Sequence, residues 1–385
     1  MTGGQTDRPE PRVLPSTKLV HLFEALTRHG YDIVGPTVRD GAIVLDRIQS
    51  PEQLPMGWTD EQSPGHYRLN RRQDDAYFGF TVGPQSWKKY FLPADLKLWS
   101  AERSNGAFHI LRNETRPPRP LALVGVRSCD LAAIAIQDRV LMQDRYVDST
   151  YASKRQGAFI VVVQCTRAAP TCFCASLQSG PATEDGFDLR ITELLPPENH
   201  HSFVNHAGSA RGAELLSELE THSPRPEDLR RESEAIATAR REQVRSIDLN
   251  GLRELINRKF DDDCWDKITA RCLTCGNCTM ACPTCFCSSI EDTSDLSGTR
   301  VERWRRWDSC FTLSFSYIHG GSVRTSTKAR YRQWLTHKLV SWVDQFGTAG
   351  CVGCGRCITW CPVGIDLTQA VHTIQEDKDK DNGNA

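Results

Sequence analysis

The sequence predicts an α/β N-terminal domain followed by a mainly helical C-terminal domain that contains a repeated cysteine motif. Three observations support this fold class. Residues 120–164 alternate strand, turn, helix and strand, which is the pattern of an α/β domain. After residue 270, a four-cysteine motif closed by proline occurs twice. Between the two copies, Lys328–Phe346 carries apolar side chains at helical spacing.

Hydrophobic periodicity predicts the elements of the N-terminal domain. Residues 17–29 are expected to form the first helix, because their apolar side chains lie on one helical face: Leu19, Leu22, Phe23 and Leu26. Short apolar or alternating runs between turn residues indicate strands. The predicted strands are Ala42–Ile48, Tyr77–Val82, Pro120–Val126, Ala158–Gln164 and Phe187–Glu193.

Shifts in composition divide the chain into five parts. The predicted parts are a disordered tail (1–14), an α/β domain (15–223), a charged helical connector (224–260), a cysteine-rich domain (261–375) and a second disordered tail (376–385). The two tails are polar, and the connector has the period of a helix. The doubled cysteine motif is the internal repeat of the chain.

Composition excludes several classes of function. The chain has 385 residues and a net charge of −1, which gives no bulk attraction to nucleic acid or to an anionic membrane. Its longest apolar run, Ala158–Val163, is far too short to span a bilayer. The N-terminus lacks the apolar region of a secretory signal. Sixteen cysteines in such a chain favour metal binding over disulfides, so we expect a cytoplasmic protein that binds neither membrane nor nucleic acid.

The two cysteine motifs share the spacing Cys-x2-Cys-x2-Cys-x3-Cys-Pro, which is typical of proteins with two [4Fe–4S] clusters. Three cysteines of a motif reach one cubane, and the fourth reaches the other cubane. The crossed ligand sets are Cys272, Cys275, Cys278 and Cys361 for cluster 1, and Cys351, Cys354, Cys357 and Cys282 for cluster 2. Zinc is the alternative, but zinc sites rarely use this spacing and have no need of it twice with crossed ligands.

The long segment between Cys282 and Cys351 exceeds what a compact ferredoxin needs, and it contains the helical pattern of Lys328–Phe346. We therefore expect a mainly helical dicluster ferredoxin domain. Its tryptophan and tyrosine side chains are expected to pack around the clusters.

Four further cysteines lie in the α/β domain: Cys129, Cys165, Cys172 and Cys174. Cys129 lies in the predicted turn Arg127–Asp130, where a strand leads into the helix Leu131–Met142, and Cys165 ends the next strand. If these strands are neighbours, the four thiols converge at one sheet edge and could bind a third cluster. The alternative is that they are ordinary buried residues or loop thiols.

The other cysteines are Cys264, Cys285, Cys287 and Cys310. They could bind a fourth cluster, or they could pack beside the first two and donate hydrogen bonds to them. The sequence contains no GxGxxG, no Walker A loop and no HExxH, so nothing marks a nucleotide or flavin site. We predict no catalytic residues in this chain.

Roughly residues 17–370 of the chain resemble a known family. Three C-terminal segments show the resemblance: Cys272-Leu-Thr-Cys-Gly-Asn-Cys-Thr-Met-Ala-Cys-Pro-Thr-Cys-Phe-Cys287, Trp307-Asp-Ser-Cys310 and Cys351-Val-Gly-Cys-Gly-Arg-Cys-Ile-Thr-Trp-Cys-Pro362. Three upstream segments show it as well: Gly83-Pro-Gln-Ser-Trp-Lys88, Val126-Arg-Ser-Cys-Asp-Leu131 and Thr171-Cys-Phe-Cys174. They are similar to the β (electron-transfer) subunits of cytoplasmic NAD(P)-linked [NiFe] hydrogenases, the sulfhydrogenases. They are also similar to the corresponding iron–sulfur subunit of anaerobic sulfite reductase. Cys264 stands where this family usually has an apolar residue.

The resemblance implies an intermediate in a hetero-oligomer. One neighbour would carry FAD and a [2Fe–2S] cluster and bind NAD(P); the other would be a [NiFe] hydrogenase or a sirohaem sulfite reductase. The first hypothesis is therefore an electron relay to a hydrogenase, and the second is the same relay to a sulfite reductase. A redox sensor that uses its clusters to hold a binding surface is a third hypothesis, of another class. The near-neutral charge and the lack of a DNA-reading motif count against it.

Overall fold

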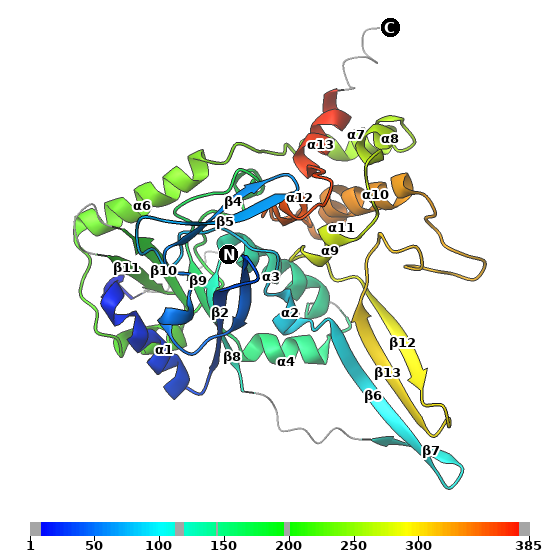
Figure 1. Ribbon diagram of the computed structural model, residues 1–385, viewed down its shortest axis with the longest axis horizontal. Helices are drawn as coiled ribbons and strands as arrows, with labels where there is room; N and C mark the ends of the chain where they lie inside the picture. Colours follow the sequence, from blue (N-terminus) through cyan, green and yellow to red (C-terminus); the bar gives the residue numbers. More distant parts are fainter. Residues whose placement is uncertain (1–8, 112–118, 144, 196–200, 377–385) are drawn as a thin grey trace.

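The computed structural model describes residues 9–111, 119–143, 145–195 and 201–376. Its N-terminal half is built on a seven-stranded sheet with the order β1-β11-β10-β9-β8-β2-β3 (Figure 1). The four central strands β2, β8, β9 and β10 are parallel, while β11 and β3 run antiparallel to their neighbours. The strands are β1 (Arg12–Pro15), β2 (Asp32–Arg39), β3 (Ala42–Arg47), β8 (Leu121–Val126), β9 (Phe159–Val163), β10 (Leu189–Leu194) and β11 (Ser202–Ala207).

Helices cover both faces of this sheet, as the buried strand β9 shows. Its side chains alternate between the faces: Phe159, Val161 and Val163 pack with α1 and α5, and Ile160 and Val162 pack with α2, α3 and α4. The helices are α1 (Leu19–Arg28), α2 (Lys88–Phe91), α3 (Ser128–Leu141), α4 (Ser149–Gly157) and α5 (Ala210–Ser217). The α/β prediction is therefore confirmed as a three-layer arrangement.

Most predicted N-terminal elements are present. The first helix has its four predicted apolar residues buried, and four of the five predicted strands match β3, β8, β9 and β10. The predicted turn Arg127–Asp130 is wrong beyond its first residue, because α3 already begins at Ser128.

The predicted strand Tyr77–Val82 is also wrong. The segment is largely buried, but side chains rather than a neighbouring strand satisfy its backbone. The Glu193 carboxylate accepts hydrogen bonds from the backbone N–H groups of Tyr77 (2.6 Å) and Phe78 (2.9 Å). The Arg127 guanidinium donates to the carbonyls of Phe78 (2.9 Å) and Phe80 (2.8 Å).

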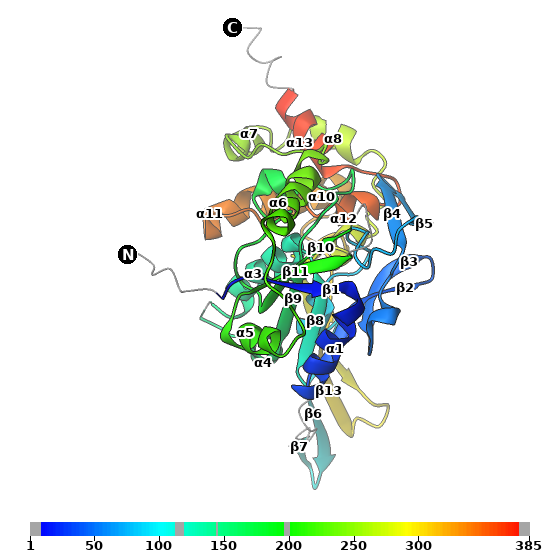
Figure 2. The same cartoon turned by 90° about the vertical axis from the view of Figure 1, so that its left-hand side faces the viewer.

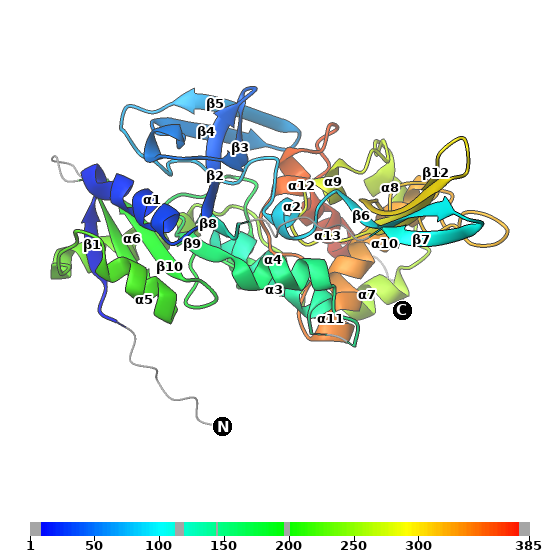
Figure 3. The same ribbon diagram turned by 90° about the horizontal axis from the view of Figure 1, so that it is seen from below.

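A four-stranded sheet with the order β12-β13-β6-β7 joins the two halves of the chain and forms a projecting arm (Figure 1). Its strands are β6 (Asp95–Ser104), β7 (Ala107–Leu111), β12 (Ser288–Ser294) and β13 (Arg300–Trp307). Figures 2 and 3 show the arm extending away from the seven-stranded sheet. The expectation of a mainly helical C-terminal domain is not confirmed, because this hairpin lies between the two cysteine motifs and pairs with a strand from the N-terminal half.

The remaining C-terminal elements are helical, and all but α11 contribute to one core. They are α7 (Leu252–Arg258), α8 (Cys264–Thr269), α9 (Asn277–Met280), α10 (Thr327–Thr336), a π-helical turn (His337–Ser341), α11 (Trp342–Phe346), α12 (Arg356–Thr359) and α13 (Leu367–Glu376). The predicted helix 328–346 is thus present, with a π turn in its middle. Trp265, Trp334 and Leu335 are among the buried residues of the core.

Three predicted boundaries need correction. The first tail is predicted to be disordered through residue 14, but β1 begins at Arg12 because it pairs with β11. The second is predicted to begin at 376, but Glu376 still belongs to α13. Residues 1–8 and 377–385 of these tails lie outside the described residues. The helical connector is broken into α6 (Pro226–Arg241) and α7, and α7 packs in the C-terminal core.

Candidate metal centre

The two cysteine motifs fold into the same backbone turn. In the first motif, Thr274 (φ 52°) and Gly276 (φ 77°) are left-handed; in the second, Gly353 (φ 59°) and Gly355 (φ 76°) occupy the same positions. Glycine adopts this conformation without strain, whereas threonine does not. The two left-handed residues of each motif curl its loop so that the first three cysteines face the same space.

Backbone N–H groups donate to the first sulfur of each motif. Thr274 N lies 3.4 Å from Cys272 Sγ, and Gly353 N lies 3.5 Å from Cys351 Sγ. Ile365 N donates in the same way to Cys361 Sγ, at 3.3 Å. Such hydrogen bonds stabilise negative charge on sulfur, as a thiolate ligand requires.

The fourth cysteine of the second motif lies with the first motif. Cys361 lines one cavity together with Cys272, Cys275 and Cys278, and Cys357 of the second group also lines it. The rest of the lining is largely apolar and includes Phe311, Tyr331, Trp334 and Leu367. Burial raises the pKa of the Cys278 thiol, and the thiols of Cys272 and Cys361 raise it further. The chain thus brings together the four residues predicted for cluster 1.

The fourth cysteine of the first motif lies with the second motif. Burial raises the pKa of Cys357, and four nearby sulfurs raise it further: those of Cys351, Cys354 and Cys282, and last that of Cys278 from the first group. The helices α9 and α12, which follow the two glycines, contact each other and so bring the motifs side by side. The four residues predicted for cluster 2 are therefore also together.

These two groups fit iron–sulfur clusters chemically. Each offers four sulfur donors, and those of the second group are deeply buried or partly buried. Thiols whose pKa values are raised by burial and by one another must lose their protons before they bind metal, so cluster assembly releases protons.

The two groups differ in exposure. Cys275 is exposed in the first group, and the adjacent Leu273 is 61% exposed. In the second group, Cys354 and Cys282 are buried. The first group therefore lies near the surface, and the second lies deeper, against the α/β domain.

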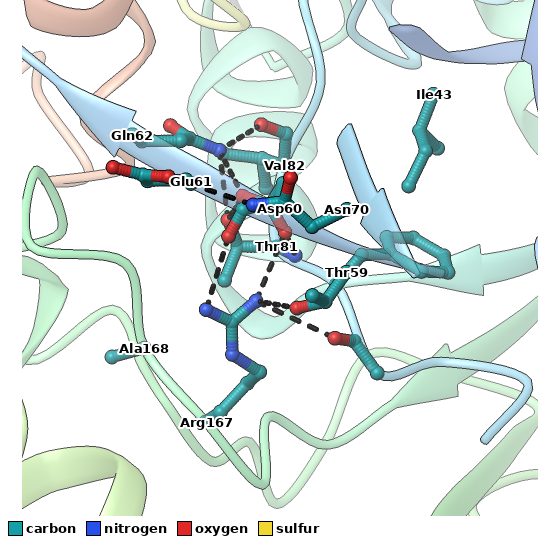
Figure 4. A network of polar contacts seen from close by, with 12 residues as sticks. Ile43, Thr59, Asp60, Glu61, Gln62, Asn70, Thr81, Val82, Arg167 and Ala168 are labelled. Atoms are coloured by element: carbon teal, nitrogen blue, oxygen red, sulfur yellow. Dashed lines mark hydrogen bonds and ion pairs between the residues drawn. The ribbon is translucent and has the colours of Figure 1, made fainter. Parts of the chain in front are cut away.

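A buried polar network fixes α12 to the α/β domain. The hairpin of β4 (Trp58–Ser63) and β5 (His66–Arg71) supplies Gln62, whose Oε1 accepts hydrogen bonds from Thr359 (2.7 Å) and Thr171 (3.2 Å). Figure 4 shows Gln62 beside Asp60 and Thr81, with Arg167 directed at Asp60. A fully buried ion pair between Arg356 and Asp130, at 2.8 Å, joins the same helix to α3.

Two Thr-Cys-Phe-Cys segments flank the second motif. In the segment 171–174, Phe173 N donates to Gly353 O at 2.8 Å, and its ring is buried in the C-terminal core. In the segment 284–287, Thr284 Oγ1 donates to Gly350 O at 2.8 Å. A Cβ at Gly355 would lie 2.5 Å from Thr171 O, so this close contact requires glycine.

The structure also brings together the four cysteines of the α/β domain. Strands β8 and β9 are parallel neighbours, so Cys129 and Cys165 leave the same sheet edge, as predicted. Burial raises the pKa of Cys172, and Cys174 and Cys165 raise it further. Cys129 packs with Cys174 and with Cys354 of the second group. Arg127 donates a hydrogen bond to Cys165 and counteracts the rise that burial causes in its pKa.

The last four cysteines separate into two environments. Cys264 is buried in the C-terminal core, and its thiol contacts Asp262. Cys285, Cys287 and Cys310 instead lie at the base of the β12–β13 hairpin, close to the second group.

Two buried lysines beside these thiols were missed by the sequence analysis. Lys338 Nζ donates to Cys282 Sγ at 3.2 Å and to Thr284 Oγ1 at 2.9 Å. Lys88 Nζ lies 4.1 Å from the centre of the Trp307 ring. The signal for Lys338 was present, since it stands four residues from both Trp334 and Trp342 on the apolar stripe.

Two groups of four cysteines, each with its fourth member from the other motif, are the arrangement expected of a dicluster iron–sulfur protein. In agreement, residues 271–365 match the 4Fe-4S dicluster domain family. The chain is also 34% identical, over 257 residues, to the sulfhydrogenase 2 subunit beta of Pyrococcus furiosus, and the match covers 66% of this chain and 74% of that protein. The chain belongs to the family of sulfhydrogenase β subunits and is an iron–sulfur electron-transfer subunit.

No helix in the described part of the chain is long and apolar enough to cross a membrane.

Proposed function

We propose that this chain relays electrons between a subunit that carries FAD and a [2Fe–2S] cluster and binds NAD(P), and a [NiFe] hydrogenase module, within a cytoplasmic hetero-oligomer. The observation that carries the proposal is the exchange of Cys361 and Cys282 between the two motifs. In this proposal Cys272, Cys275, Cys278 and Cys361 hold cluster 1, and Cys351, Cys354, Cys357 and Cys282 hold cluster 2. Bound [4Fe–4S] clusters supply one-electron transfer, which links a two-electron flavin to a metal catalyst.

The difference in exposure between the two groups supports a position for each cluster in the relay. Cluster 1 would lie next to the exposed Cys275, where a partner can approach, and cluster 2 would lie against the α/β domain. The lining of the first cavity is largely apolar, and the Gln62–Thr359 hydrogen bond holds α12 to the α/β domain.

The α/β cysteines would extend the same route. We propose that Cys129, Cys165, Cys172 and Cys174 hold a third cluster, supported by their common sheet edge and by the packing of Cys129 and Cys174 against Cys354. Replacing Cys172 by alanine in the full chain should remove about four irons per chain while the two crossed clusters stay. Iron and acid-labile sulfide analysis of anaerobically purified protein measures this, and an unchanged iron content would make these four residues ordinary buried thiols.

The relay itself is tested in the complete complex. In Cys275→Ala or Cys354→Ala variants, NAD(P)H-linked hydrogenase turnover should fall close to background, because the route is interrupted. Hydrogen turnover with an artificial one-electron dye should persist, because the dye reaches the catalyst directly. The matched control is Cys264→Ala, a buried cysteine outside both groups, which should leave both activities intact.

Three results would contradict the relay. Loss of both activities in an assembled complex would mean that this chain takes part in the chemistry. Retention of both would mean that the clusters are structural, as in a sensor. Co-purification of a sirohaem protein in place of a nickel protein would assign the relay to a sulfite reductase.

A further inference from the structure

The base of the β12–β13 hairpin brings three unassigned cysteines together. Cys285 and Cys287 immediately precede β12, and Cys310 follows β13. The register pairs Ser288 with Trp307, and Asp308 N donates to Cys287 O at 2.9 Å. The hairpin therefore places the chain before β12 beside the chain after β13.

Cys285 and Cys287 lie two residues apart in the coil that leads into β12, and the thiol of Cys285 is in hydrogen-bond contact with that of Cys282. Phe286 between them packs against Trp342, with ring centres 6.3 Å apart, and against His337. Across the hairpin, the thiols of Cys287 and Cys310 are in hydrogen-bond contact.

A buried cation lies beside these sulfurs. Lys88 is 4% exposed. Among the described residues no carboxylate forms an ion pair with it, since its ammonium lies over the Trp307 ring. Burial lowers the pKa of Lys88, while the sulfurs of Cys285 and Cys287 counteract that shift. A buried ammonium is costly unless an anion lies near it.

We propose that Cys285, Cys287 and Cys310 bind an additional iron–sulfur cluster whose negative charge is balanced by the buried ammonium of Lys88. The inference goes beyond the relay proposed above, because the two crossed clusters use none of these three thiols. The additional cluster can be absent while the two crossed clusters are present, and the reverse is equally possible.

The charge of Lys88 separates this proposal from a simple dithiol. Protonated thiols or a disulfide between Cys287 and Cys310 would be neutral and would leave the ammonium uncompensated. Three thiolates bound to iron and sulfide form an anion, which would offset the cost of burying the ammonium of Lys88. Cys282 contacts both Cys285 and Lys338, so the proposed site adjoins the second group; the proposal leaves Cys282 with cluster 2.

The test compares the full chain with its Cys287→Ala/Cys310→Ala double variant, both assembled anaerobically. The double variant should lose about three to four irons per chain, with matching sulfide, while the signals of the two crossed clusters persist in the reduced EPR spectrum. Cys264→Ala is the matched control and should lose no iron. A second variant, Lys88→Met, should lower the reduction potential of the additional cluster or its retention and leave the crossed clusters unchanged.

A measurement on the wild-type chain covers the case in which the double variant does not fold. Cys285, Cys287 and Cys310 should resist alkylation in the native holoprotein and react once iron is chelated, as peptide mass spectrometry would record. Alkylation of these three thiols in the iron-loaded protein, a Cys287–Cys310 disulfide, or stoichiometric zinc in place of the lost iron would each overturn the proposal.

Discussion

Cys361→Ala should empty cluster 1, which is held by residues far from it in sequence, and spare the cluster nearest to it. Cys361 lines the cavity of Cys272, Cys275 and Cys278, so its loss leaves that cubane with three cysteine ligands. About four of the eight irons of the crossed pair should be lost. Because the two clusters contain the same amount of iron, iron analysis does not show which one is lost. Alkylation of the cysteines that lose their cluster identifies it. Cys272, Cys275 and Cys278 should become reactive in the native variant.

The matched experiment is Cys282→Ala, which should give the mirror-image result. There Cys351, Cys354 and Cys357 should become reactive, and the first group should stay protected. The spin–spin interaction between the two reduced clusters should disappear from the EPR spectrum of both variants. If Cys361→Ala instead exposes Cys351, Cys354 and Cys357, each motif holds its own cluster and the exchange is wrong.

The cysteine groups could be predicted because their geometry is encoded locally. The spacing fixes three sulfurs on one loop, and the glycines at 276 and 355 permit the left-handed turns that the loop needs. The convergence of Cys129 with Cys165 was predictable for a similar reason, since adjacent parallel strands end at one edge. To predict that the fourth cysteines are exchanged between the motifs, the general ligand pattern of two-cluster ferredoxins was needed as well.

The arm could not be predicted, because it depends on pairing between distant segments. Strand β6 pairs with β13, about two hundred residues later, and the arginines of β13 hide the alternation by which strands are recognised. Those arginines are paired in the fold: Arg303 with Asp292, and Arg306 with Glu291 and Asp95. The wrong prediction of a strand at Tyr77–Val82 has the opposite cause. Its sequence pattern is strand-like, but the side chains of Glu193 and Arg127 make the backbone hydrogen bonds that a neighbouring strand would make.

The buried lysines mark the limit of sequence-based prediction in the candidate site. A lysine in a helix is usually solvated, so only the position of Lys338 between two tryptophans indicated that it is buried. It lies in the π turn His337–Ser341, and such turns redirect side chains, often at functional sites. Burial alone would lower the pKa of Lys338, but the sulfurs of Cys282, Cys285 and Cys351 raise it well above its usual value. The residue is thus a buried cation at the second group.

Lys338→Met should lower the reduction potential of cluster 2. The ammonium donates to Cys282 Sγ at 3.2 Å, and a positive donor stabilises the reduced, more negative cluster more than the oxidised one. A hydrogen bond to a charged group contributes about 1.5–3 kcal/mol, and a tenfold change in a one-electron equilibrium is about 59 mV. If roughly half of that energy is differential, the potential should fall by about 30–65 mV. Redox titration followed by EPR measures it, most simply in the Cys361→Ala background, where cluster 1 is absent.

The control uses the same substitution on the same helical segment. Lys328 lies near the beginning of α10 and pairs with Asp266 rather than with a cysteine, so Lys328→Met should leave the potential unchanged. Lys338→Arg keeps the charge and should recover part of the lost potential, which a purely structural role for Lys338 does not predict. An unchanged potential in Lys338→Met, with iron content intact, would show that the ammonium serves only the packing of the helix. A shift confined to cluster 1 in the otherwise unmodified chain would instead contradict the assignment of Cys282 to the second group.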